Sequence, residues 1–163
     1  MSGGRAWQLR AATSDDLDAI MAIESRVFEG DAWSAATMLA ELRDRNGRYL
    51  VAFPPDDPGR VDAYAGLRAP LRQPQADIQT IAVVESARGH GLGRVLVLRM
   101  IDLARERGAV ELFLEVRADN PVAKALYDSL GFEEIAVRPG YYGGVVDAVI
   151  MRLRIPEPKA GLA

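Results

Sequence analysis

Apolar residues recur with helical spacing in four parts of the chain. In the first part, Leu17, Ile20, Ile23 and Val27 fall on one side of a predicted helix. The four helices are predicted to run from the capping residues 13–16 to Phe28, from Ser34 through Leu42, from the glycine-rich residues 88–94 to Gly108, and over residues 121–130. Helices with one apolar side pack that side against a core.

Seven short apolar segments outside these helices predict β-strands. They cover residues 7–11, 49–53, 61–69, 76–84, 111–116, 132–138 and 145–153. Prolines and glycine in residues 54–59 predict a turn that makes a hairpin of the second and third strands. Residues 139–144 are expected to turn between the last two strands, which are then antiparallel. In the fifth strand, the run Leu112-Phe113-Leu114 predicts burial on both faces.

Strands and helices are mixed along the whole chain of 163 residues, without an internal repeat or a change in composition. This arrangement predicts a single α/β domain over residues 1–155. Residues 156–163 are expected to form a flexible tail.

The composition narrows the possible chemistry. The chain has no cysteine, which excludes disulfides, cysteine zinc sites and acyl-cysteine intermediates, and its one histidine, His90, excludes a multi-histidine metal site. A net charge of −3 argues against a primary nucleic-acid binder. No segment reaches the roughly 18 apolar residues that span a membrane, and no secretory signal is recognisable. A cytoplasmic protein without a metal is therefore expected.

A glycine-rich run, Arg88-Gly89-His90-Gly91-Leu92-Gly93-Arg94, lies between a predicted strand and a predicted helix. Backbone N–H groups at such a helix start can hold a phosphate. The run lacks the Gly-Lys-Ser/Thr of a Walker loop, and Arg94 stands where a dinucleotide-binding loop has its third glycine. Glu111, a carboxylate about 20 residues further on, keeps the dinucleotide interpretation open. A further interpretation is a tight turn without a ligand.

Several motifs resemble those of the GNAT acetyltransferases. Arg88-x-x-Gly91-x-Gly93 is similar to the family signature Arg/Gln-x-x-Gly-x-Gly/Ala. Around it, in family order, stand Thr80-Ile81-Ala82-Val83, Leu114-Glu115-Val116-Arg117-x-x-Asn120 and Ala125-Leu126-Tyr127-x-x-x-Gly131-Phe132. The resemblance covers residues 76–153. One departure is Val84-Glu85, where the family usually has Asp-Pro.

Within the family, the chain looks closest to the RimI branch. The segments that carry this likeness are Leu-Glu-Val-Arg at residues 114–117, Tyr141-Tyr142 and Asp147-Ala148-x-Ile150-Met151. The RimI branch acetylates protein N-termini, usually the N-terminal alanine of a small-subunit ribosomal protein. The likeness implies the same acceptor here. A small-molecule amine as acceptor, or a non-catalytic acyl-CoA-binding regulatory domain, are the alternatives.

The resemblance also implies a fold and a cofactor site. The GNAT fold has a mostly antiparallel central sheet with splayed middle strands, flanked by helices. Main-chain groups of Ile81, Ala82 and Val83 would bind the pantetheine arm of acetyl-CoA, and Asn120 would bond the arm or the acetyl side. The pyrophosphate would be held by the residues Arg88, Gly89, His90, Gly91, Leu92, Gly93 and Arg94. His90 is also interpretable as a solvent-facing filler within this loop.

Two residues are candidates for proton transfer. The family spacing implies that Glu115, at the carboxyl end of an apolar strand, is the base that deprotonates the acceptor ammonium, directly or through a water. An N-terminal ammonium has a pKa of about 7.7–8.0, so a modest base suffices. Tyr127 would protonate the leaving thiolate, and a main-chain N–H near Val83 would meet the oxyanion. Without the neighbouring motifs, the favoured interpretation of Glu115 is a solvated surface residue, and that of Tyr127 is a packing residue.

Three aromatic residues are candidates for the acceptor wall. Trp33, beside the acidic Glu29 and Asp31, falls where the second helix of the family borders the acceptor groove. Tyr141 and Tyr142 either wall the same groove or pack a β-turn. The oligomeric state is left open by the sequence.

Overall fold

A single mixed sheet of seven strands runs through the structure, a computed structural model that describes residues 6–156. The strands are β1 (Gln8–Ala11), β2 (Gly47–Phe53), β3 (Ala63–Arg68), β4 (Gln75–Val83), β5 (Glu111–Arg117), β6 (Glu133–Tyr142) and β7 (Val146–Arg154). The helices are α1 (Leu17–Val27), α2 (Ala35–Arg43), α3 (Leu92–Glu106) and α4 (Pro121–Ser129), with short 3₁₀ turns at Ser14–Asp16 and Glu85–Ala87. The strand order is β1-β2-β3-β4-β5-β7-β6.

All the predicted strands and helices are present, so the mixed α/β fold expected from the sequence is confirmed. The expected tail at residues 156–163 lies, apart from Pro156, outside the described residues. Two predictions about strands are wrong.

The first error concerns the turn predicted at residues 139–144. Strand β6 continues to Tyr142, and its register against β7 shifts between Arg138 and Tyr142. Pro139 is tolerated here because β6 is an edge strand. The N–H groups on its outer edge have no neighbouring strand to bond, so a residue without an N–H fits there. The Asp147 carboxylate accepts a hydrogen bond from Gly140 N at 2.9 Å, which supports the irregular stretch.

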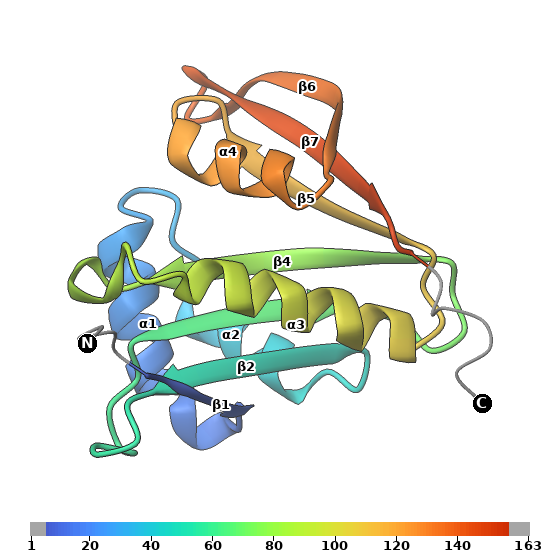
Figure 1. The fold of residues 1–163 in the computed structure, drawn as a ribbon. Helices are drawn as coiled ribbons and strands as arrows, with labels where there is room; N and C mark the ends of the chain where they lie inside the picture. Colours follow the sequence, from blue (N-terminus) through green and yellow to red (C-terminus); the bar gives the residue numbers. More distant parts are fainter. Residues whose placement is uncertain (1–5, 157–163) are drawn as a thin grey trace, which may run out of the picture.

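The second error concerns β5, which is not buried on both faces. Leu112, Leu114 and Val116 are buried, whereas Phe113 is half-buried and Glu115 is exposed. The buried side packs into the core cluster that contains residues of α3 and α4. Helices α1 and α2 pack against β2, β3 and β4 instead, so the other side of β5 is left without a helix over it (Figure 1).

The middle of the sheet opens as a fork. Strands β4 and β5 are parallel and pair only at Gln75–Glu111, Ala76–Leu112 and Asp77–Phe113. Just beyond these pairs, the register of β4 against β3 shifts between Gly66 and Leu67, and such a bulge bends a strand. Figure 1 shows β5, β6, β7 and α4 diverging from the rest of the sheet. The splayed middle strands implied by the family resemblance are therefore present.

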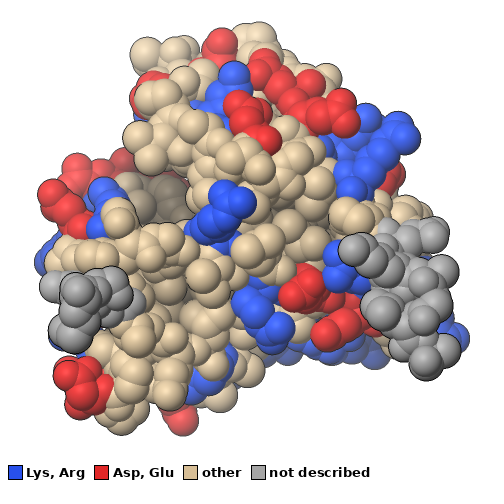
Figure 2. All heavy atoms as spheres, in the orientation of Figure 1, with Lys and Arg blue, Asp and Glu red and all other residues tan. Residues whose placement is uncertain are grey.

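Two apolar clusters fill the two sides of the sheet. One lies between the sheet and helices α3 and α4, and it includes Leu96, Met100 and Tyr127. The other lies under α1 and α2, and it includes Ile20 and Met38. Figure 2 shows acidic and basic side chains interspersed over the face that carries α3.

Candidate active site

The glycine run forms the turn that starts α3 at the open end of the fork. Gly89 and Gly91 both have φ +80°, a left-handed conformation that costs side-chain-bearing residues energy. A Cβ at either position would meet nothing within 4 Å, so the approach to their backbone is open. Leu92 is buried and anchors the first turn of the helix in the core. The 15-residue helix α3 thus presents its N-terminal N–H groups at an accessible surface.

The edge of β4 beside the loop carries main-chain groups that no strand pairs. Val84 N donates to Asp62 O at 2.9 Å, and this fixes the alternation of the ladder with β3. By that alternation Ala82 pairs with Tyr64, whereas the N–H and C=O groups of Ile81 and Val83 point away from β3 into the fork. Of the three predicted residues, Ile81 and Val83 are therefore the ones whose main chain faces an incoming arm.

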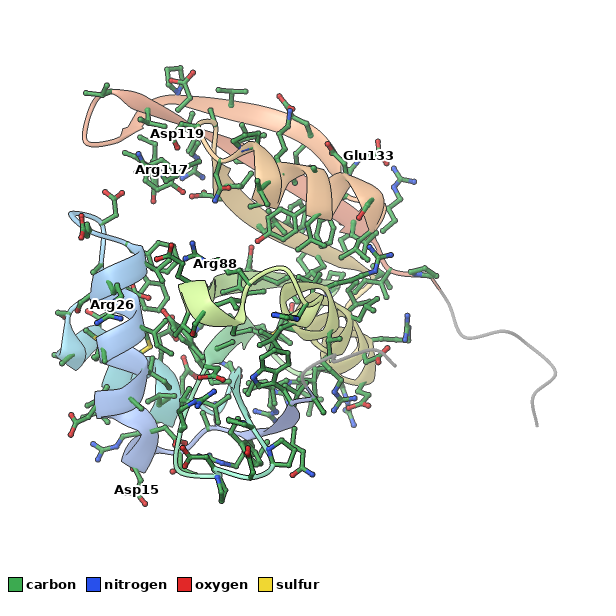
Figure 3. The ribbon with its side chains drawn as sticks, turned by 60° about the vertical axis from the view of Figure 1, so that its left-hand side comes forward. Asp15, Arg26, Arg88, Arg117, Asp119 and Glu133 are labelled. Atoms are coloured by element: carbon green, nitrogen blue, oxygen red, sulfur yellow. The ribbon has the colours of Figure 1, made fainter. Side chains whose placement is uncertain are left out.

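Arg88 reaches back from the loop to this edge. Its Nε donates to the Val83 carbonyl at 3.0 Å. Figure 3 shows Arg88 on one side of the fork, with Arg117 and Asp119 together on the other. The first arginine of the loop therefore lies between the glycine turn and the β4 edge, and it links the two parts of the predicted cofactor site.

Two contacts hold the loop side of α3 against α4. A Cβ on Gly93 would lie 3.6 Å from a methyl of Leu126, an ordinary van der Waals distance, so the start of α3 lies beside α4. Arg94 Nη1 donates to Ser129 Oγ at 3.1 Å, and Ser129 in turn donates to Leu126 O. These contacts connect the loop to the helix that carries Tyr127.

His90 is exposed at the tip of the loop, but it has an aromatic neighbour. Its ring lies 5.6 Å from that of Trp7, at an interplanar angle of 53°. Trp7 is itself fixed by a bond from Nε1 to Asp62. The residue before β1 therefore packs against the glycine loop, and His90 faces solvent with one aromatic neighbour.

Asn120 serves first as the N-cap of α4. Its side-chain oxygen accepts a hydrogen bond from Ala123 N at 3.2 Å, and Pro121 follows in the first helical turn. Its position at the start of α4 puts it directly after β5 at the open end of the fork. The predicted bond to the cofactor stays a prediction.

Glu115 lies on the uncovered side of β5. No helix covers this side of the strand, and about a third of the Glu115 side chain (31%) is exposed. Its carboxylate pairs with Arg138 Nη1 at 3.2 Å. The pairing follows from the strand order β5-β7-β6, which places Arg138 one strand beyond the partner of Glu115.

Tyr127 is buried on the opposite side of β5. Its ring packs edge-on against Phe132, with centroids 5.8 Å apart. Burial, with a smaller contribution from Tyr142, raises the pKa of Tyr127 to about 12. The phenol therefore keeps its proton at neutral pH, as a proton donor must. Both interpretations of this residue, packing and proton donation, fit its position.

The two candidate residues flank the fork rather than touch each other. Leu114 and Val116 belong to the same core cluster as Tyr127, so Glu115 between them points to the other face. The glycine loop and α4 lie on the Tyr127 side. A thioester entering from that side and an amine entering from the Glu115 side would meet at the fork.

Tyr141 and Tyr142 lie on the Glu115 side. Their rings meet edge-on at 5.1 Å, Arg117 stacks on Tyr142 at 4.9 Å, and Arg138 stacks on Tyr141 at 5.6 Å. Partial burial, followed by the negative charge of Glu115, raises the pKa of Tyr142. Both tyrosines therefore line the surface beside the candidate base, and that this surface is the wall of an acceptor groove stays a prediction.

The loop between α1 and α2 closes this wall. Asp31 accepts a bond from Arg117 Nη1 at 2.5 Å, while the same guanidinium holds Asp119 at 2.9 Å. A cavity of about 340 Å³ is lined here by Arg26, Val27, Phe28, Glu29, Asp31 and Arg117. Trp33 is half-buried and packs against the core under α1 and α2. Trp33 therefore lies on the core side of the loop.

Arg117 and Arg138 were not predicted as site residues. Arg117 stands in the Leu-Glu-Val-Arg motif, and this position was the available signal. Arg138 gave no signal, because its contact with Glu115 depends on the order of strands in the sheet.

Two searches of residues 6–156 returned nothing. No cluster of three or more histidine, aspartate or glutamate side chains is placed to hold a metal ion. Over the same residues, no helix combines the length and the apolar character needed to cross a membrane.

The residues present fit acetyl-CoA. The unpaired edge of β4 offers alternating donors and acceptors to an arm that contains amides, and the glycine turn offers N–H groups without a Cβ to block a diphosphate.

Comparisons with known proteins agree with this geometry. The model of the acetyltransferase (GNAT) family matches residues 16–132. The [ribosomal protein bS18]-alanine N-acetyltransferase of Salmonella typhimurium is 40% identical over 147 residues, covering 88% of this chain and 94% of that protein. An uncharacterized Mycobacterium leprae protein is 39% identical over 86% of this chain, which spans only 38% of that protein's length.

A solved structure agrees as well. The crystal structure of the ribosomal-protein-S18-alanine N-acetyltransferase from Escherichia coli superimposes with a TM-score of 0.82. Its sequence is 33% identical, and the match covers 97% of this chain and 99% of that one.

Proposed function

The chain belongs to the GNAT acetyltransferase family, and from this premise we propose that its acceptor is a protein N-terminal α-amino group. Transfer of acetyl from acetyl-CoA to an amine follows from the family. The relatives named for the alanine of ribosomal protein bS18 support an N-terminal alanine as the acceptor residue. A ribosomal protein as partner implies action in the cytoplasm.

One observation carries the proposal most directly. The fork holds Tyr127 on the side of the glycine loop and Glu115 on the side of the α1–α2 loop and the two tyrosines. An extended peptide terminus can enter between that loop and β6, while the thioester enters along β4. The amine and the thioester then approach from opposite sides, as direct transfer requires.

The residues divide the proton transfers between them. Glu115 accepts a proton from the acceptor ammonium, directly or through water, and the neutral nitrogen attacks the thioester carbonyl. The N–H of Val83 points into the fork and would donate to the oxygen that gains charge. As the carbon–sulfur bond breaks, Tyr127 gives its proton to the thiolate. The attacking nitrogen releases its second proton to solvent, from which the phenolate regains a proton. The burial that raises the pKa of Tyr127 would also raise the pKa of a thiol beside it, because burial disfavours the charged thiolate.

The test is a panel of acceptors incubated with acetyl-CoA. Peptides that begin with alanine should gain one acetyl group at the α-nitrogen, located by mass spectrometry, and the same peptides with a blocked N-terminus should gain none. Acetylation of polyamines or aminoglycosides, with no reaction at alanine peptides, would replace the proposed acceptor by a small amine. Binding of acetyl-CoA without transfer to any amine would favour a regulatory domain.

A further inference from the structure

Glu24 is a buried carboxyl group that takes no part in the acetyl transfer described above. It lies on α1 and is 2% exposed. Among the ion pairs of the described residues, none includes Glu24. A carboxyl group buried without a cation is costly unless hydrogen bonds satisfy it. Its hydrogen bonds therefore indicate what it holds in place.

The first bond fixes the loop between α1 and α2. Glu24 Oε2 accepts from Trp33 N at 2.9 Å, nine residues further along the chain. The main-chain oxygen of Glu24 accepts from Phe28 N at 2.9 Å, where α1 ends. The side chain of Glu24 thus holds the Trp33 end of the segment that lines the cavity beside Arg117, and the other end of the segment follows directly from α1.

The second bond fixes Glu24 to the sheet. The hydroxyl of Tyr64, a fully buried residue of β3, donates to Glu24 Oε1. The same hydroxyl lies 3.5 Å from the Thr80 hydroxyl on β4. Thr80 directly precedes Ile81, where the unpaired edge of β4 faces the fork. The loop is therefore connected, through the side chains of Glu24, Tyr64 and Thr80, to the strand that would hold the thioester.

We propose that Glu24 is a positioning residue for the acceptor. It holds the α1–α2 loop at a fixed distance from β4, so that an entering peptide terminus meets the thioester at the fork. The inference rests on the proposed function, because it assigns the loop to the acceptor. Glu24 itself touches neither substrate.

The substitution E24Q tests this role. An amide keeps the shape of the side chain but has only one accepting oxygen. If its nitrogen faces Trp33, the bond from Trp33 N is lost; if its nitrogen faces Tyr64, the hydroxyl must accept instead of donate and turns away from its present orientation. We expect the KM for an alanine-starting peptide to rise about tenfold or more, with kcat and the Kd for acetyl-CoA within about twofold. Y64F, which removes one donor, should change the same constant in the same direction. Faster hydrogen exchange at the Trp33 amide in E24Q would show that the bond from Trp33 is the one lost.

A matched control separates positioning from stability. Asp16 is also a buried carboxylate; it accepts from Arg10 and Thr13 N at the start of α1, away from the acceptor loop. D16N should lower the thermal midpoint and leave the peptide KM unchanged. An unchanged peptide KM in both E24Q and Y64F would overturn the inference. Failure of the wild type to acetylate alanine peptides would instead contradict the proposed function, before the variants are compared.

Discussion

At the scale of single residues, the surroundings of each side chain decide its chemistry. Glu115 is exposed and pairs with Arg138, so the proposed ammonium would approach its carboxylate from solvent. Tyr127 is buried, and its phenol keeps its proton until the pH is far above neutral. One strand, β5, separates the two environments, which is how a base and an acid can act within a small site.

The role of Glu115 can be tested by E115Q. The amide keeps the shape of the side chain but cannot accept a proton, so kcat for an alanine peptide should fall about 100-fold or more. E111Q is the matched control, because Glu111 lies on the same strand, pairs with Arg152 and stands at the closed end of the fork. Equal activities of E115Q and wild type in a CoA-release assay would remove Glu115 from the mechanism.

The raised pKa of Tyr127 has a consequence for stability in alkali. Because the folded-state pKa of about 12 lies above the ordinary tyrosine value of 10.0, the native state keeps this proton longer than the unfolded chain. Its contribution is complete below pH 10 and is lost as the pH rises toward 12, by roughly 2–3 kcal/mol in total. Guanidinium unfolding from pH 9 to 12 should show a steeper loss for wild type than for Y127F. Parallel curves would contradict the burial.

At the scale of elements, phosphate binding depends on the start of α3 more than on the length of the helix. Gly89 and Gly91 take a left-handed backbone conformation, and Leu92 anchors the first turn. The helix then follows with its N–H groups directed at the approach of a ligand. Phosphate binding by main-chain groups depends on this geometry and on the absence of side chains from the turn.

The glycine turn can be tested by G91A. A Cβ at φ +80° costs about 1–2 kcal/mol of backbone strain and stands where a diphosphate must approach. The Kd for acetyl-CoA, measured by calorimetry, should rise about tenfold or more. Gly30 has φ +82° with the same open space, in the α1–α2 loop. G30A carries similar strain and should leave this Kd unchanged, whereas equal losses in both variants would indicate a general effect of strain.

At the scale of the whole molecule, the sheet consists of two halves joined at one end. Three pairs between β4 and β5 form the closed end. At the open end, the ion pair between Asp31 and Arg117 connects the α1–α2 loop to the end of β5. Arg117 also stacks on Tyr142, so this contact joins the loop to β6 as well. The width of the acceptor entrance depends on these few contacts.

A double-mutant cycle with D31N and R117Q measures this connection. For a partly exposed ion pair, the coupling free energy should be about 0.5–1 kcal/mol at low salt. In 1 M salt it should decrease markedly, because the screening length is then only about 3 Å. Urea unfolding of the four proteins at both salt concentrations gives the value. A coupling of zero at low salt would show that the ion pair between Asp31 and Arg117 contributes nothing to holding the α1–α2 loop against β5.

Local pattern in the sequence was enough for the order of the elements, the glycine turn and the family motifs. Apolar spacing, helix caps and turn residues act over a few neighbouring positions, so they can be read along the chain. The tertiary structure decided the rest: that Glu115 is exposed, that Arg138 pairs with it, and that Trp33 is held by Glu24. These contacts join positions brought together by the strand order and by the fork between β4 and β5, and no local pattern encodes that proximity.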